Sequence, residues 1–438
     1  MYKDILKIAV PAIISNIAVP LLGLLDLAIA GHLGATAFIG AVAVGAMMFN
    51  LTYWNLGFLR MGTSGMTAQA FGAGNREEAA RLLYRASALA LAIGTAIILL
   101  QQPLQWALLT AIAPDAEVTE LARSYFFICV WGAPAMLGTM SLSGWCIGMQ
   151  NSTYPMIVSI TVNIVNIVAS LACVFLLDMR FLGIPTGTLI AQWTGFLLNI
   201  AFCLRIMRRY SIPLPFHLDG ILRDMRKFFS VNSDIFLRSL CMMLVMLFFT
   251  AAGARSGKTT LAVNAVIMQM FTLYSYFMDG FAYAGEAIAG KHVGAGNRKG
   301  LIDTVKALFL SGSGVMLAFT LLYGLAGNQV MGLITDDADV LRHASHYRLW
   351  SAAVPVAGMA AFIWDGIFIG MTASRQILTT VFLASASFFV LYFGVHQIIP
   401  DPNNRLWLAF ITYLAIRGII QLLIYRQMLR KEAWKRFD

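Results

Sequence analysis

Twelve long apolar runs constrain the fold of this chain more than any other feature. A helix needs about 20 apolar residues to cross a hydrocarbon core about 30 Å thick. The runs lie at about 5–31, 37–66, 79–103, 118–148, 153–177, 183–207, 229–253, 259–289, 301–326, 341–371, 375–399 and 405–428. The hydrocarbon core contains no water to hydrogen-bond exposed backbone N–H and C=O groups, so such runs fold as helices. We predict an all-α integral membrane protein with twelve transmembrane helices, the longer ones tilted or bent.

The charged residues support a membrane protein and argue against nucleic-acid binding. Only 12% of the 438 residues are charged, whereas a soluble domain carries roughly 25%. The formal net charge is +10, but Lys and Arg cluster in the loops of one side. That asymmetry is typical of cytoplasmic loops. We expect a multi-pass protein of a bacterial-type inner membrane with both termini in the cytoplasm, and no nucleic-acid partner.

An internal repeat divides the chain into two halves. The sequence "GAGNR" occurs at 72–76 and again 222 residues later at 294–298. The same offset relates nine further identical pairs: Gly31/Gly253, Ala43/Ala265, Val44/Val266, Met48/Met270, Phe49/Phe271, Tyr125/Tyr347, Gly144/Gly366, Gly148/Gly370 and Met149/Met371. Six helices separate the copies, so both halves share one orientation, as in transporters with parallel repeats. A duplicated bundle without transport is the alternative.

We therefore predict two pseudo-symmetric six-helix lobes joined by a linker. The N-lobe comprises residues 1–207, a cytoplasmic linker 208–228, and the C-lobe 229–438. The linker is the longest polar stretch and contains two prolines, which favour loop structure. In both "GAGN" loops, glycine permits a tight turn, and Asn75 or Asn297 is suited to cap the helix that follows.

Asp26 is the clearest ionisable residue within a predicted spanning helix. A charged residue at the centre of a membrane helix costs about 2.5–3.5 kcal/mol on insertion scales, and such residues often carry protons or line a cavity. No basic residue lies one turn away from Asp26. A carboxyl group that is exposed to each side in turn is a minimal device for proton coupling. A structural Asp that is hydrogen-bonded to polar neighbours is the alternative.

The fifth and sixth predicted helices offer polar neighbours for this carboxyl group. Asn163, Asn166 and Ser170 share one helical face, and Thr188 is placed to join them. Such side chains can bind a carboxyl group in either protonation state, although they also serve as polar contacts between helices. In the first helix, Pro11 and Pro20 interrupt backbone hydrogen bonding, so a bend there is expected to respond to the state of the acidic residue.

The second half contains further acidic residues in its predicted helices. Asp279 and Glu286 are seven residues apart and share a face, and Asp365 lies in the tenth helix. These three residues are candidates for the substrate cavity or for secondary coupling. Structural pairing with Arg60, Arg238 or Arg417 is the alternative. The six histidines form no metal-binding pattern such as H-E-x-x-H, so we expect no metal and no cofactor.

Several of these segments together resemble the MATE (multidrug and toxic compound extrusion) family, and in particular its DinF-like branch. The resemblance covers nearly the whole chain. It is carried by "PLLGLLDLAIAGHLG" at 20–34, "GMTAQAFGAGN" at 65–75, "VNIVNIV" at 162–168, "AVNAV" at 262–266 and "DGFAYAGEAIAGKHVGAGN" at 279–297. It implies a twelve-helix, two-lobed transporter that exports drugs or other amphipathic compounds in exchange for protons or sodium ions.

The resemblance also implies roles for individual residues. Asp26, Asn166 and Thr188 match a cation site in the N-lobe of prokaryotic members. Ser170 stands where those members have a second aspartate, which makes a poorer cage for a hard cation. The coupling ion is therefore expected to be a proton, with sodium as the alternative. Pro11 matches a proline at which the first helix bends in some relatives.

The expected function is a proton-coupled multidrug antiporter that works by alternating access. Its substrate is expected to be a small amphipathic or cationic compound in a cavity between the lobes, and the protein is expected to be a monomer. In other branches the coupling carboxylates lie in the C-lobe, where Asp365 is a candidate counterpart. A sodium-coupled exporter and a flippase for lipid-linked oligosaccharides or polysaccharides remain as alternatives. An intramembrane enzyme is disfavoured.

Overall fold

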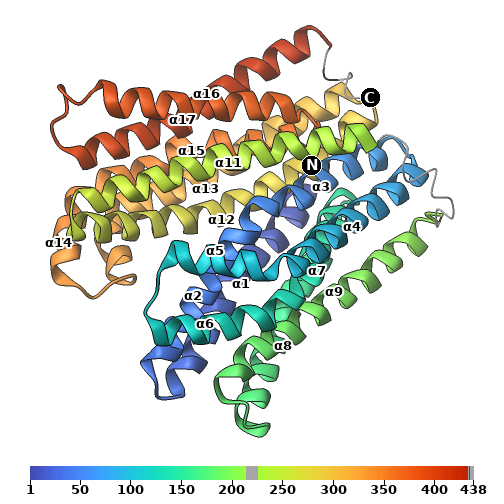
Figure 1. Cartoon of the computed structure of the whole chain (residues 1–438). Coiled ribbons are helices and arrows are strands. Elements are labelled where there is room, and N and C mark those ends of the chain that lie inside the picture. Colours follow the sequence, from blue (N-terminus) through green and yellow to red (C-terminus); the bar gives the residue numbers. More distant parts are fainter. Residues whose placement is uncertain (214–224, 433, 435–438) are drawn as a thin grey trace. The chain divides into compact units, whose positions relative to one another are not determined.

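The fold was analysed in a computed structural model that describes residues 1–213, 225–432 and 434 (Figure 1). Within these residues every regular element is a helix. Twelve helical segments are long and apolar enough to cross a membrane, which confirms the predicted number. The chain divides into two compact units: one contains Ile14–Arg226, and the other contains Met1–Ile13 together with Lys227–Asp438. Residues 214–224 of the predicted linker lie outside the described residues.

The first helix, α1 (Tyr2–His32), contributes to both units, because the boundary falls after Ile13. The remaining helices of the first half, all in the unit Ile14–Arg226, are α2 (Thr36–Tyr53), α3 (Phe58–Gly72), α4 (Arg76–Leu99), α5 (Gln101–Ile112), α6 (Ala116–Cys129), α7 (Ala133–Gly148), α8 (Thr153–Leu171) and α9 (Gly183–Arg209). In this unit α7 packs against α3, α4 and α9, while α8 packs against α9.

The second unit has a similar arrangement around a central helix. Its helices are α11 (Met225–Arg255), α12 (Lys258–Gly294), α13 (Arg298–Gly332), α14 (Ala338–His346), α15 (Arg348–Gly370), α16 (Ser374–Gly394) and α17 (Pro402–Arg430). The central helix α15 packs against α12, α13 and α17. It occupies the place in this unit that α7 occupies in the other.

Repeated glycines allow the same close helix packing in both units. A side chain at Gly144 of α7 would meet the Arg60 carbonyl oxygen at 2.3 Å, and one at Gly366 of α15 would meet the Ala282 carbonyl oxygen at 2.2 Å. Residues 60 and 282 are related by the same 222-residue offset as the two glycines. The sequence repeat is therefore a repeat of three-dimensional packing.

The two "GAGN" loops also have matching geometry. Gly74 and Gly296 adopt φ values of +69° and +64°, which glycine reaches without a steric penalty. The Asn75 side chain accepts a hydrogen bond from the Glu78 amide at 3.0 Å, and Asn297 accepts one from Gly300 at 2.8 Å. Both asparagines are N-caps, which confirms the capping prediction.

Two of the longest apolar runs are broken by short irregular turns, as expected from their length. The 3-10 turn Trp54–Gly57 separates α2 from α3, and a second one at Val130–Gly132 separates α6 from α7. The five residues directly after α8, Ala172–Leu176, form a π-helical turn, and Arg180–Leu182 form a 3-10 turn before α9. In contrast, α1 is assigned as one helix through both of its prolines.

Two predicted boundaries were wrong. The run predicted at 79–103 ends as α4 at Leu99, and a separate helix α5 begins at Gln101. Pro103 explains the new start, because proline is tolerated in the first turn of a helix but not in its interior. The run predicted at 341–371 is likewise divided at Tyr347, between α14 and α15.

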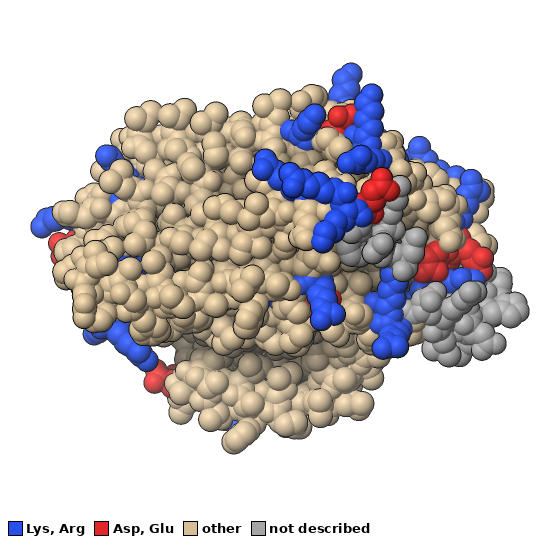
Figure 2. Space-filling model, turned by 90° about the horizontal axis from the view of Figure 1, so that it is seen from above, with Lys and Arg blue, Asp and Glu red and all other residues tan. Residues whose placement is uncertain are grey.

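One face of the molecule shows how charged side chains are distributed over the surface. On the face shown in Figure 2, Lys and Arg side chains gather toward one end, and few charged groups lie between the two ends. This distribution is that of a protein whose central band contacts hydrocarbon rather than water.

Candidate ion-coupling site

The Asp26 side chain lies inside the unit Ile14–Arg226. The residue is only 3% exposed, and no ion pair joins it to a basic residue in the described part of the chain. Burying a carboxyl group without a cationic partner is costly. The group therefore needs hydrogen bonds or a bound proton or cation.

Two residues on neighbouring helices extend the polar contacts of Asp26. The Thr188 hydroxyl of α9 donates to Asp26 Oδ2 at 3.2 Å. The Asn166 amide of α8 in turn donates to Thr188 Oγ1 at 2.9 Å. One residue from each of α1, α8 and α9 thus forms a continuous polar chain.

The hydrogen bonding of this chain is incomplete. Thr188 Oγ1 also lies 3.2 Å from the Ile184 carbonyl oxygen, but a hydroxyl has one hydrogen to donate. Asp26 Oδ1 and Asn166 Oδ1 are buried and accept no hydrogen bond from any described residue. Buried polar atoms are rarely left in this state, so the two oxygens are suited to a proton or a small cation.

The other two polar residues predicted on α8 do not contact the carboxyl group. Ser170 is fully buried, and its hydroxyl donates to the Ile184 carbonyl at 3.4 Å. The Asn163 amide donates to the Ala18 carbonyl of α1 at 2.8 Å, two turns before Asp26. Both residues hold neighbouring helices together around the site.

Sequence reasoning missed a contribution from α6. Tyr125 and Cys129 are buried. Both belong to an apolar cluster with Ile29 of α1 and Ile184 of α9, the helices that carry Asp26 and Thr188. Gly45 of α2 provides space for the tyrosine, because a side chain at this glycine would meet the ring at 2.4 Å. The sequence signal that could have pointed to Tyr125 is its match with Tyr347 in the internal repeat.

The equivalent positions of the second half are aromatic. The 222-residue offset relates Asp26 to Phe248 and Asn166 to Phe388. These two rings lie in contact, with centroids 5.9 Å apart. Only the first half therefore has a carboxyl group at this place in the repeat.

Comparisons with known proteins identify the family. A family model described as MatE matches residues 11–171 and 235–393, one stretch in each half. The DNA damage-inducible protein F of Escherichia coli K12 is 36% identical over 432 residues, which cover 99% of this chain and 94% of that protein. The chain belongs to the MatE family. Its members are multidrug transporters rather than enzymes.

Solved structures of MATE transporters share the fold of this MatE chain. A crystal structure described as MATE in the bent conformation matches with a TM-score of 0.84 and 20% identity, covering 99% of this chain and 96% of that one. The Vibrio cholerae MATE transporter VcmN in the bent form matches with a TM-score of 0.85 and 16% identity, covering 98% and 97%. The chain is a multi-pass membrane protein of this architecture.

In the second half of this MatE chain, Asp365 is held by several partners. Its Oδ2 atom accepts hydrogen bonds from Arg238 of α11 and from Arg417 of α17, the latter at 2.5 Å. Its Oδ1 atom accepts one from the Gln421 amide at 2.7 Å. All four residues are buried. The arrangement joins three helices and pairs the carboxylate with two arginines.

Asp279 and Glu286 of α12 lie in different environments despite their helical spacing. Asp279 is partly exposed, whereas Glu286 is 1% exposed. Glu286 is related to Ser64 by the repeat offset. A side chain at Gly370 would meet the Glu286 carbonyl oxygen at 2.6 Å, just as one at Gly148 would meet the Ser64 carbonyl oxygen at 2.7 Å. Position 286 therefore has the same packing role as position 64 in α3.

Proposed function

We propose that this MatE transporter is a proton-coupled antiporter with Asp26 as the residue that binds the proton. It exports small amphipathic or cationic compounds by alternating access and acts as a monomer. The supporting observation is the incompletely bonded polar chain of Asp26, Asn166 and Thr188.

The protonation state of Asp26 determines where the Thr188 hydrogen goes. When the carboxyl group is ionised, the Thr188 hydroxyl donates to Oδ2 and links α9 to α1. When the carboxyl group is neutral, it has its own hydrogen to donate. Thr188 can then accept from Asp26 and donate to the Ile184 carbonyl at 3.2 Å. Proton binding thereby reverses the hydrogen bond between the two helices.

A proton suits this site better than a sodium ion. The site supplies one carboxylate, one amide oxygen and one hydroxyl. Hard cations are bound by several oxygen ligands, whereas a proton needs only Asp26 and one acceptor. Sodium coupling is the alternative that the experiment below tests.

The prolines of α1 offer a route from proton binding to a change of conformation. The boundary between the compact units falls after Ile13, between Pro11 and Pro20. Each proline removes a helical hydrogen bond, so α1 bends there at low cost. We propose that the reversed Asp26 contact changes the bend of α1.

The arginines of the second half favour an amphipath exporter over a flippase for phosphate-linked lipids. A cavity for phosphate groups needs accessible cations. Arg238 and Arg417 are buried and donate to Asp365, so their charge is partly neutralised. By the distribution of Lys and Arg, we place both termini in the cytoplasm of an inner membrane.

The test is an exchange assay in proteoliposomes with separately imposed proton and sodium gradients. A fluorescent cationic dye serves as substrate, and a pH dye reports proton movement. We expect the proton gradient alone to drive dye transport, and the Asp26→Asn variant to lose this response. Glu120→Gln is the control, because that carboxylate is exposed in a surface pair with Arg123.

Two results would contradict the proposal. An Asp26→Asn protein that still moves protons upon dye transport would exclude Asp26 as the coupling residue. Dye transport that follows the sodium gradient, and is indifferent to the proton gradient, would instead favour the sodium-coupled alternative.

A further inference from the structure

A long apolar groove runs along the surface of the unit that contains α13, α15 and α17. It has a volume of about 920 Å³ and is lined by residues of these three helices. Its lining extends along α17 from Ile411 to Leu429, a length of about 27 Å at 1.5 Å per residue. Small residues such as Ala357 and Ala415 form part of it. The groove is long enough for an extended acyl chain.

One end of the groove is polar and positively charged. Lys306 and Arg426 line this end, and both are exposed and form no ion pair with a described residue. Arg298 lies beside them, because it donates to the Leu429 carbonyl at 3.3 Å. The nearby Tyr425 is 5% exposed, and its hydroxyl has no hydrogen-bond partner among the described residues. The opposite end carries no charged lining residue.

We propose that this groove binds an anionic glycerophospholipid from the leaflet on the basic side of the protein. The acyl chain lies along Ala357, Ala415 and Ile419, and the phosphate headgroup lies between Lys306 and Arg426. The complementarity of charge at one end and of apolar surface along the rest identifies this occupant. The proposal does not depend on the transport function proposed above.

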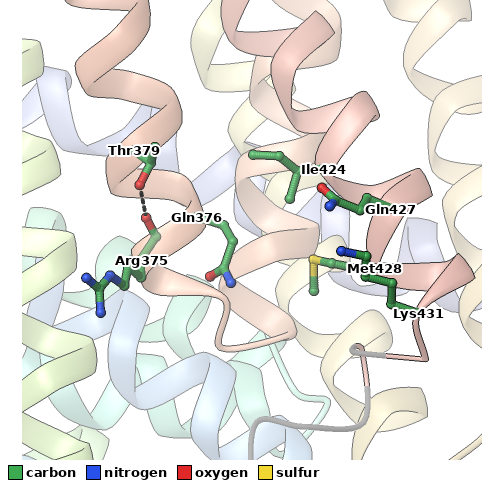
Figure 3. Close-up of a pocket in the computed structure, with 7 residues that line it drawn as sticks. All are labelled: Arg375, Gln376, Thr379, Ile424, Gln427, Met428 and Lys431. Atoms are coloured by element: carbon green, nitrogen blue, oxygen red, sulfur yellow. Dashed lines mark hydrogen bonds between the residues drawn. The ribbon is translucent and has the colours of Figure 1, made fainter.

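A neighbouring pocket has exposed cations but lacks a long apolar groove. It lies between the ends of α16 and α17, with Arg375, Gln376 and Thr379 from the first helix and Gln427, Met428 and Lys431 near the end of the second (Figure 3). It also has two exposed cations, Arg375 and Lys431. Its volume is only about 360 Å³. It therefore supplies a matched control for general attraction of anions to this end of the protein.

The test measures phospholipid binding to the purified full-length protein by native mass spectrometry. An anionic phosphatidylglycerol and a zwitterionic phosphatidylcholine with identical acyl chains are compared. One basic residue near an anionic headgroup contributes about fivefold in affinity, so two contribute about 30-fold. We expect Lys306→Gln/Arg426→Gln to weaken binding of the anionic lipid by about this factor, and to weaken binding of the zwitterionic lipid less, because its choline cation offsets the phosphate charge.

Two further variants separate the groove from its charges. Arg375→Gln/Lys431→Gln should change the affinity for the anionic lipid by less than about threefold, as expected for charges outside the groove. Ala415→Phe should weaken the binding of both lipids, because the phenyl ring fills the space for the acyl chain. Equal losses in the two charge variants would overturn the proposal, as would a folded Ala415→Phe protein with unchanged lipid binding. If Ala415→Phe does not fold, the comparison of the charge variants decides.

Discussion

Replacing Asp365 with Asn should destabilise the protein strongly. The substitution keeps the size of the side chain but removes its negative charge. Asp365 is the shared acceptor of Arg238 and Arg417, whose side chains are only 6% and 3% exposed. Removing one partner of a buried ion pair costs about 3–5 kcal/mol, because the remaining charge stays buried without compensation. One kcal/mol shifts Tm by about 2–4 °C in a domain of 150–250 residues, so we expect a loss of about 6–20 °C.

The assay is thermal unfolding of the purified protein in detergent. Unfolding is measured as the fraction of monodisperse protein that is lost after heating. Glu120→Gln is the control, since its partner Arg123 is 45% exposed and 3.1 Å away. Exposed ion pairs contribute about 0–1 kcal/mol. The Tm of this control should therefore stay within a few degrees of the unmodified protein.

A double variant tests the reasoning about charge. Arg417→Met removes one of the two arginines, so in the Asp365→Asn background it leaves one fewer uncompensated charge. We expect Asp365→Asn/Arg417→Met to be more stable than Asp365→Asn alone. The reasoning is refuted if the effects of the two substitutions add, or if Asp365→Asn leaves Tm unchanged while abolishing proton-driven transport. The second result would make Asp365 a coupling residue rather than a structural one.

Three further predictions concern the first-half site and the repeated loops. Thr188→Val, which keeps the shape but removes the hydroxyl between Asp26 and Ile184, should abolish proton-driven dye transport, while Thr188→Ser should retain it; equal activity of the two variants would exclude the hydroxyl from coupling. Gly45→Ala places a methyl group 2.4 Å from the Tyr125 ring and should lower stability by about 1–3 kcal/mol, whereas Gly23→Ala, with no atom within 4 Å, should have a much smaller effect in the same thermal assay. Asn297→Ala removes the N-cap of α13 and should cost about 1 kcal/mol; a thermal stability equal to that of the unmodified protein would contradict the role of the cap.

Much of the architecture could be predicted from the sequence because its physical causes are local. Lipid requires long apolar helices, so hydrophobic length alone gave the number of spans. The "GAGN" loops contain their own turn and cap, so Asn75 and Asn297 could be predicted as helix N-caps before any tertiary contact was known. Boundaries were less certain, as at Leu99 and Tyr347, because hydrophobic length does not show where a helix is interrupted.

The candidate site could be predicted only in part. Asp26 stands out in the sequence because a carboxyl group in an apolar run is costly wherever the helix packs. The choice among Asn163, Asn166 and Ser170 could not be made from helical spacing, since all three share one face of α8. Only the packing of α1 and α9 shows that Asn166 joins Thr188 at the carboxyl group.

The sequence by itself determined that this chain crosses a membrane twelve times in two related halves and carries an acidic residue in its first helix. The tertiary structure alone decided which acidic residue is neutralised by cations and which is not. Asp365 meets two arginines that are 127 and 52 residues away along the chain, while Asp26 meets a hydroxyl 162 residues away. Pairing over such separations depends on how the helices pack, and helix periodicity contains no information about which faces meet.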